Sequence, residues 1–155
     1  MFEDNCAIRA ASSDDVARVR SIARDAYSKY VVRLGREPLP MVADFAAEIA
    51  AGHVMVIEVE RSVVGYMIAW AESEAYLVDN LAIEPARQGL GLGRRLLDHA
   101  VREATRLRLP AVRLYTNVAM TENRAIYAHL GFVETHREAG IHRVHMRLSV
   151  PRVSP

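Results

Sequence analysis

The sequence is poor in cysteine, in lysine and in aromatic residues. Its one cysteine, Cys6, excludes an intrachain disulfide and a metal cluster built on cysteines. Lys29 is the one lysine among 20 basic residues, and 19 acidic residues almost balance them, so the formal net charge is +1. A charge so close to zero gives no electrostatic reason to bind nucleic acid or a membrane surface, and we expect neither as a partner.

Long hydrophobic runs are also missing. No apolar stretch reaches 18 residues and the first residues are acidic, so the sequence shows neither a membrane span nor a secretory leader. We therefore predict a cytoplasmic protein. The length of 155 residues, with 51% hydrophobic and 25% charged residues, favours one globular domain over 1–155, in which 150–155 form a loose tail.

The histidines do not have the spacing of a metal site. His142 and His145 are three residues apart on a predicted strand, so they point to opposite faces, and His99 shares the outward side of a helix with Asp98. We interpret all six histidines as structural or solvated and expect no metal.

Hydrophobic periodicity predicts an α/β protein. Apolar residues at helical spacing follow a capping box at Ser12 and Asp15 and predict a first helix of about 15–18 residues. A second helix is expected to begin near Pro40 and to stop at Gly52, a third ends near Leu107, and a fourth covers 121–130. Extended runs predict strands at 6–10, 53–60, 63–71, 76–83, 111–117, 132–138 and 141–150. The order β-α-α-β-β-β-α-β-α-β-β predicts a mixed sheet flanked by helices.

A glycine-rich segment, 88–94, joins a buried strand to an amphipathic helix. Glycines let the backbone approach a ligand, and a helix start offers unpaired N–H groups, so the segment favours a phosphate or pyrophosphate. Glycines that merely serve a tight loop are the alternative. A P-loop is excluded because no Gly-Lys precedes Ser or Thr. The dinucleotide fingerprint is excluded because it needs glycine where Arg94 or Leu96 stands.

The remaining pattern, Gln88-x-x-Gly91-x-Gly93, resembles the acetyl-coenzyme A loop of the GNAT superfamily of N-acetyltransferases. The run from Tyr127 to Phe132 resembles the closing Tyr-x-x-Leu-Gly-Phe of that family, and 81–85 resembles the strand end before its loop. The opening strand and helix and the order of elements are also similar, so the resemblance covers almost the whole chain. It implies the mixed, mostly antiparallel central sheet of that family.

The resemblance also implies acetyl-coenzyme A as co-substrate. The main chain of Leu81 and Ile83 would pair with the pantetheine arm as a further strand would. Many relatives place an asparagine seven residues before the tyrosine, where this chain has Met120, so Asn123 and Asn117 are the candidates for that contact. The loop that would hold the pyrophosphate consists of Gln88, Gly89, Leu90, Gly91, Leu92, Gly93 and Arg94.

Two residues are candidates for acid–base chemistry. An amine must lose its proton before it attacks a thioester, and Asp79, in an otherwise apolar strand, is the candidate base. One of Asp79 and Asn80 must face a covered side of the sheet, and a structural carboxylate is the alternative for Asp79. Tyr127 matches the usual general acid of the family, which would protonate the leaving thiolate; a core tyrosine is the alternative.

These features together predict an acetyl-coenzyme A-dependent N-acetyltransferase. It would move acetyl to a primary amine, small molecule or peptide, by direct transfer in a ternary complex. The alternatives are a non-catalytic acyl-coenzyme A sensor of the same fold, and transfer to oxygen or of a longer acyl group. Tyr27, Tyr30 and Arg33 are the expected substrate residues, with solvated charges as the alternative for Arg33. We also expect a homodimer that forms through an edge such as 141–150.

Overall fold

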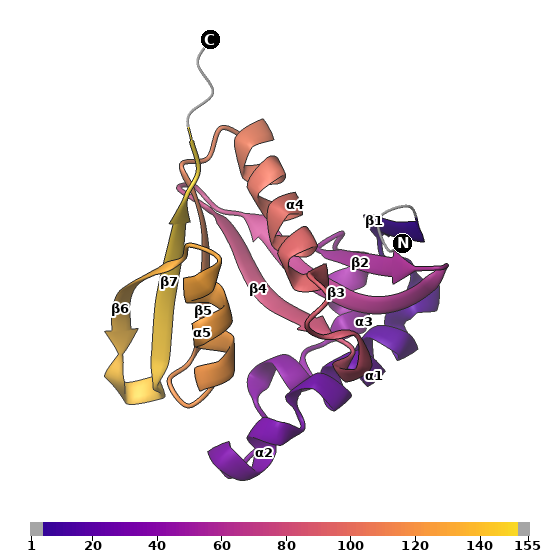
Figure 1. Ribbon diagram of the computed structural model, residues 1–155, viewed down its shortest axis with the longest axis horizontal. Coiled ribbons are helices and arrows are strands. Elements are labelled where there is room, and N and C mark those ends of the chain that lie inside the picture. Colours follow the sequence, from indigo (N-terminus) through magenta and orange to yellow (C-terminus); the bar gives the residue numbers. More distant parts are fainter. Residues whose placement is uncertain (1–4, 152–155) are drawn as a thin grey trace. The chain divides into compact units, whose positions relative to one another are not determined.

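The computed structural model describes residues 5–151, and it has the mixed α/β fold that the sequence predicts (Figure 1). Seven strands form one sheet in the order β1-β2-β3-β4-β5-β7-β6. β4 and β5 pair in parallel, whereas β1–β2, β2–β3, β5–β7 and β6–β7 pair antiparallel. The strands are β1 (Cys6–Ala10), β2 (Val54–Val59), β3 (Ser62–Ala71), β4 (Tyr76–Ile83), β5 (Ala111–Asn117), β6 (Val133–Glu138) and β7 (Arg143–Ser149). The α-helices are α1 (Val16–Tyr27), α2 (Lys29–Leu34), α3 (Phe45–Ala50), α4 (Leu92–Arg106) and α5 (Thr121–His129), with a short 3-10 turn, η3, at Leu39–Val42.

The chain divides into two compact units. The first holds the chain up to Ala69 together with Asn80–Leu96, and the second holds Trp70–Asp79 and the chain from Leu97 onward. The boundaries therefore fall inside β3, β4 and α4. The prediction of one domain over the whole chain stays a prediction.

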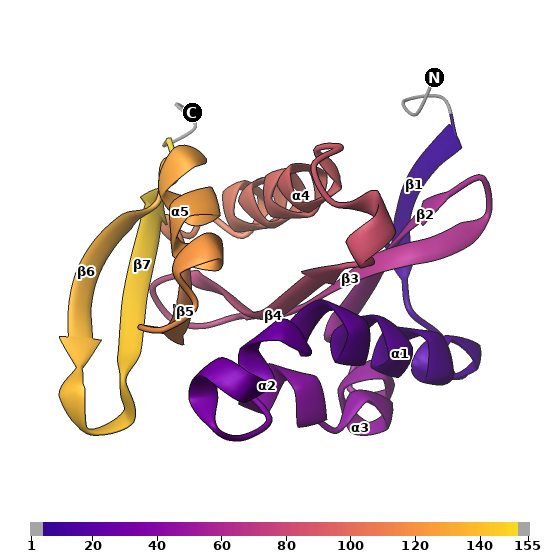
Figure 2. The same cartoon turned by 60° about the horizontal axis from the view of Figure 1, so that its bottom comes forward.

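In the first unit, α1 and α3 lie on one face of the strands (Figure 2). Val19 and Ile22 of α1 are fully buried because they fall on one face of the helix. Phe45 of α3 packs edge to face against Tyr66 of β3, with ring centroids 5.6 Å apart. The apolar residues at helical spacing in α1 and α3 are therefore those that pack on the strands.

In the second unit, β5 and β7 pair along their whole lengths, from Ala111 with Ser149 to Asn117 with Arg143. The last strand of the chain therefore lies between β5 and β6, and the expected edge at 141–150 is wrong. The edge strand beside β7 is β6, whose six residues are all exposed and mostly charged or polar. Charged side chains on an edge oppose strand pairing between molecules. The homodimer stays a prediction.

Two helix boundaries differ from those predicted. The first helix is interrupted at Ser28, whose hydroxyl donates to the carbonyl oxygen of Asp25 at 3.1 Å and so competes with the main chain. The second helix begins at Phe45 rather than near Pro40, because the Asp44 carboxylate caps it by accepting from the Ala47 N–H at 3.0 Å.

The expected loose tail is partly held in place. The Val150 N–H donates to the Pro110 carbonyl at 2.9 Å, and the Val150 side chain is buried. Residues 152–155 of that tail lie outside the described residues.

Gly65 of β3 is expected to be intolerant of any side chain. A Cβ there would lie 2.5 Å from Cδ1 of Ile83 and 3.0 Å from the Ala82 carbonyl oxygen. We expect Gly65→Ala to lower the free energy of unfolding by about 1–3 kcal/mol, measured by urea denaturation. Gly140→Ala is the control, because a Cβ at Gly140 meets nothing within 4 Å. Equal effects of the two substitutions would contradict the crowding at Gly65.

Candidate active site

The glycine loop lies in the first unit, between β4 and α4. Gly89 and Gly91 have φ of +82° and +81°, values that L side chains adopt only with strain. A Cβ at either glycine would meet nothing within 4 Å, so the loop presents open backbone. The first amides of α4 have no carbonyl one turn earlier within the helix, and the first turn carries no acidic residue. This arrangement suits a phosphate group.

Gln88 ties the loop to β4. Its side-chain Nε2 donates to the Ile83 carbonyl oxygen at 3.0 Å. A Cβ at Gly93 would lie 3.8 Å from Leu81 Cδ2 and 3.9 Å from Ile83 Cγ1, so the first turn of α4 packs directly on the strand. Leu92 is buried, whereas Leu90 and Arg94 are exposed. Both ends of the loop are therefore held in place, one by the end of β4 and the other by the first turn of α4.

The two carbonyls expected to bind pantetheine already accept side-chain hydrogen bonds. The Leu81 oxygen accepts from the Tyr27 hydroxyl at 2.9 Å, and the Ile83 oxygen accepts from Gln88. A carbonyl oxygen has two lone pairs, so each keeps capacity for a second donor. The described register between β4 and β5 covers Tyr76–Val78 with Val112–Leu114 and stops short of Leu81.

Asn80 is the residue of the Asp79-Asn80 pair that faces a covered side of the sheet. Its side chain is 3% exposed, and its Oδ1 accepts from the Tyr66 hydroxyl at 2.8 Å. Asp79, in the second unit, accepts at Oδ1 from the Tyr115 hydroxyl at 2.5 Å. Its Oδ2 has no hydrogen-bond partner within residues 5–151, and so can accept a proton or a water molecule.

Tyr115 of β5 is a candidate site residue that sequence reasoning missed. Burial, and then its hydrogen bond to Asp79, raises the pKa of Tyr115 to about 12. The guanidinium of Arg143, on β7, lies 4.1 Å from the ring centroid. Tyr115 therefore keeps its proton at neutral pH and holds the Asp79 carboxylate in one orientation. A tyrosine in an alternating strand gives no sequence signal of this role.

Tyr127 lies on α5 in the second unit. It is 9% exposed, and its ring packs edge to face against Phe132, with centroids 5.8 Å apart. Gly131, with φ of +101°, ends the helix as predicted. This packing fixes the direction of the tyrosine ring.

The two asparagine candidates have different environments. Asn117 accepts at Oδ1 from the Ala119 N–H at 2.8 Å and so stabilises the turn before α5. Asn123 lies half-buried on α5, one turn before Tyr127. Met120, which stands at the position of the usual asparagine, is buried. Both assignments stay predictions.

The expected substrate residues belong to the first unit. Tyr27 and Tyr30 are both buried, so their side chains present little exposed surface. Arg33 is exposed, and its guanidinium lies 5.2 Å from the ring centroid of Tyr30. A hollow of about 320 Å³ lies beside α1, lined by Arg20, Arg24, Glu37, Met41, Val42, Ala43 and Phe45.

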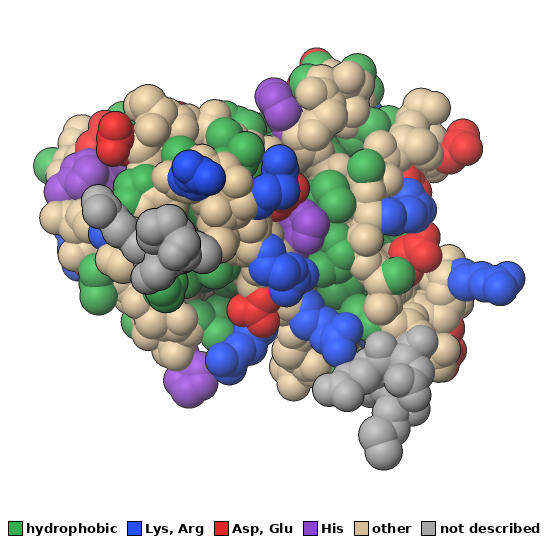
Figure 3. All heavy atoms as spheres, turned by 90° about the horizontal axis from the view of Figure 1, so that it is seen from above, with side chains coloured by type: hydrophobic (Ala, Val, Ile, Leu, Met, Phe, Trp, Pro, Cys, Tyr) green, Lys and Arg blue, Asp and Glu red, His purple; other side chains and the backbone are tan. Residues whose placement is uncertain are grey.

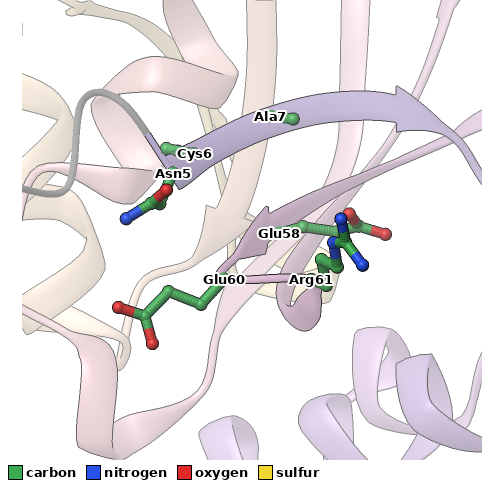
Figure 4. A pocket seen from close by; sticks show the side chains of 6 residues that line it. All are labelled: Asn5, Cys6, Ala7, Glu58, Glu60 and Arg61. Atoms are coloured by element: carbon green, nitrogen blue, oxygen red, sulfur yellow. The ribbon is translucent and has the colours of Figure 1, made fainter.

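A second hollow, of about 430 Å³, is lined from β1 and from the β2–β3 turn and contains none of the predicted site residues (Figure 4). Figure 3 shows one face of the molecule, on which several basic side chains lie near one another, with acidic and hydrophobic side chains beside them. In the described part of the chain, no three His, Cys, Asp or Glu residues are grouped as a metal site would need. No helix between residues 5 and 151 is long and apolar enough to span a bilayer.

The hydrogen bond between Tyr115 and Asp79 makes the stability of the protein depend on pH in the alkaline range. The folded pKa of Tyr115 lies above the value of about 10 of an unfolded chain, so its contribution to stability is complete below pH 10 and is lost as pH rises through about 12. We expect the phenolate absorbance that the wild type shows and Tyr115→Phe lacks to appear near pH 12 as the pH is raised. Asp79→Asn should move that titration downward, because a neutral amide no longer disfavours the phenolate. Titration of Tyr115 near 10 in the wild type would refute the contact.

Comparisons with known proteins agree with the fold of this chain. Ard1 from Thermoplasma volcanium has a similar structure, with 22% identity, 96% of this chain and 99% of that chain covered, and a TM-score of 0.73. The PaiA N-acetyltransferase from Thermoplasma acidophilum, in complex with coenzyme A, shows 13% identity, coverage of 93% and 98%, and a TM-score of 0.79. The ribosomal-protein-S18-alanine N-acetyltransferase from Escherichia coli shows 17% identity, coverage of 96% for both chains, and a TM-score of 0.68.

The TM-scores of these three structures indicate that they share the fold of this chain. A sequence model of the Acetyltransferase (GNAT) domain matches residues 50–134, which include the glycine loop, β4, β5 and α5. Acetyltransferases of this family use acetyl-coenzyme A. Because the matched segment is more than half of the 155 residues, the chain belongs to the GNAT acetyltransferase family.

Proposed function

We propose that this protein transfers an acetyl group from acetyl-coenzyme A to a primary amine. The observation that carries the proposal is the open glycine backbone at Gly89 and Gly91, directly before the first turn of α4. Backbone N–H groups of this kind bind phosphate without a metal, and the bound thioester supplies the acetyl group. The solved N-acetyltransferases with the same fold support an amine as acceptor.

Asp79 and Tyr127 each carry out one of the proton transfers that the reaction needs. Asp79 accepts a proton from the acceptor ammonium at Oδ2, directly or through water, because Tyr115 occupies Oδ1. The neutral amine then forms a bond with the acetyl carbon as the carbon–sulfur bond breaks, and the nitrogen of the new amide loses its second proton to solvent, as Asp79 later loses the proton that it accepted. Tyr127 donates the proton of its hydroxyl to the leaving sulfur, and solvent later returns a proton to the tyrosine.

One observation favours the alternative of a non-catalytic acyl-coenzyme A sensor. Tyr127 is 9% exposed and packs on Phe132, as a core tyrosine would. A sensor would bind the coenzyme but would release no thiol in the presence of any amine.

The test is a thiol-release assay with acetyl-coenzyme A and a panel of amino acids, polyamines, aminoglycoside-like amines and peptide N-termini. We expect release above background with at least one amine, and the acetylated product should be detectable by mass spectrometry. Alcohols and longer acyl thioesters are included to detect transfer to oxygen or of another acyl group. Binding of acetyl-coenzyme A without thiol release from any acceptor would overturn the proposal.

A further inference from the structure

One face of the sheet in the second unit is polar and partly exposed. β7 lies between β5 and β6 (Figure 1), and its register places His145 opposite Tyr115 of β5. Side chains alternate along a strand, so Arg143, two residues before His145, lies on the same face. The hydrogen bond from the Tyr115 hydroxyl brings Asp79 of β4 to this face as well. All four residues are partly exposed, and all four belong to the second unit.

Most basic side chains on this face have a hydrogen-bond partner within the chain. Such a partner neutralises or occupies the side chain, so it has little left to offer a ligand. The pairs are Arg113 with Glu72, Arg147 with Ser149, His145 with Glu138, and His136 with Thr135.

Arg143 differs from these side chains. Its guanidinium lies 4.1 Å from the ring centroid of Tyr115, and the side chain is 30% exposed, yet it donates no hydrogen bond to any residue between 5 and 151. The carboxylate beside it is that of Glu138, whose Oε1 is 3.9 Å from Arg143 Nη1, too far for a hydrogen bond. The same Oε1 lies 2.5 Å from His145 Nε2. The five N–H donors of Arg143 are therefore available to a ligand.

The ring of Tyr115 connects this free cation to a free acceptor. The hydroxyl end of the ring donates to Asp79 Oδ1, and the face of the ring carries the Arg143 guanidinium. Asp79 Oδ2 accepts from no residue within 5–151. One side of a single aromatic ring thus presents a carboxylate oxygen and a guanidinium, each without a hydrogen-bond partner in the described chain. This pair of charges is complementary to a small ligand that carries both an ammonium and an anionic group.

We propose that the acceptor is a free amino acid, whose carboxylate binds Arg143 while its amine lies at Asp79. The inference rests on the proposed function, because it takes the acceptor amine to the proposed base. A planar guanidinium matches a carboxylate through two parallel N–H···O bonds. Glu138, 3.9 Å from Arg143, repels a dianionic phosphate more than a carboxylate of single charge. Arg143 is then a specificity-determining residue.

The test measures kcat/KM for pairs of acceptors that differ only in the anionic group. The standard amino acids, β-alanine and γ-aminobutyrate are each compared with the corresponding carboxamide, with acetyl-coenzyme A as donor. We expect the wild type to prefer the best amino acid over its amide, and Arg143→Gln to lower that preference about 10–100-fold, the size of a charge-assisted hydrogen bond. The comparison between variants cancels any difference in basicity between the two amines.

The matched control is Arg147→Gln. Arg147 lies on the same strand and the same face, four residues beyond Arg143, and its Nη1 donates to the Ser149 hydroxyl at 2.8 Å. We expect this variant to keep the preference for the amino acid, and both variants to keep KM for acetyl-coenzyme A within about two-fold. If Arg143 served only to pack on Tyr115, its replacement would lower kcat/KM equally for the amino acid and the amide.

The outcomes separate this inference from the proposed function. If the wild type acetylates amines without preferring an amino acid to its amide, or if both arginine variants lose the preference equally, the inference is overturned and the activity stands. A higher kcat/KM with O-phosphoethanolamine than with any amino acid also overturns it, because the anionic group would then be a phosphate.

If no acceptor is acetylated, the proposed function fails, and calorimetric titration of the same amino acids into protein saturated with coenzyme A tests Arg143 by itself. Binding to the wild type that is lost in Arg143→Gln and kept in Arg147→Gln would support the carboxylate contact. Equal affinity in all three proteins, or no binding to any of them, would overturn it.

Discussion

Replacement of Tyr127 by phenylalanine should lower kcat by about 10²–10⁴-fold, the usual contribution of a general acid. Phenylalanine keeps the edge-to-face packing on Phe132 and removes the hydroxyl proton. Binding of acetyl-coenzyme A should therefore change little, and kcat and kcat/KM should fall together, as expected for an interaction made in the transition state. The measurement is steady-state kinetics with the best amine, with single-turnover rates to show that chemistry limits kcat.

Two further variants make this result interpretable. Tyr76→Phe, at the start of β4, is the control for loss of a partly buried tyrosine hydroxyl, and we expect it to keep kcat. Tyr127→Ala should lower the free energy of unfolding by about 3 kcal/mol or more, because it opens a cavity beside Phe132. A Tyr127→Phe variant with at least half of the parent kcat would refute the acid role, and the thiolate would then leave unassisted or take its proton from water.

Substitution of Gly91 by aspartate should abolish the thermal stabilisation by acetyl-coenzyme A. A ligand that binds only the folded state stabilises it by about 2.7 kcal/mol at 100 times its Kd, so the shift in Tm is large and its loss is clear. A carboxylate at Gly91 would occupy the open space beside the loop backbone and repel the pyrophosphate.

Gly35→Asp is the matched control for strain. Gly35 has φ of +71°, close to the +81° of Gly91, and a Cβ at either position meets nothing within 4 Å. The two variants should lose similar stability without ligand, and only Gly91→Asp should lose the shift with acetyl-coenzyme A. An undiminished shift in Gly91→Asp would show that the phosphates bind elsewhere.

The local features of this protein could be predicted from the sequence. Strands at 6–10, 76–83 and 111–117 were predicted with the bounds that the structure has, because apolar β-rich runs are bounded by turn residues. The glycine spacing at 88–93 also identified the loop, because glycine permits the left-handed φ values that Gly89 and Gly91 adopt. The loop pattern and the run from Tyr127 to Phe132, together with the order of elements, then indicated the family, which the domain match confirms.

Contacts between distant segments were decided by the tertiary structure. The sequence by itself determined that one of Asp79 and Asn80 must be covered, but the packing of α1 and η3 decided that it is Asn80. The tie between Tyr115 and Asp79 spans 36 residues and depends on the parallel pairing of β4 with β5. Periodicity reports which face of an element is apolar, whereas a hydrogen bond between two elements depends on register and on what packs against each face. The sequence by itself therefore determined the loop and its glycines, whereas the tertiary structure decided which residues contact the candidate acid and base.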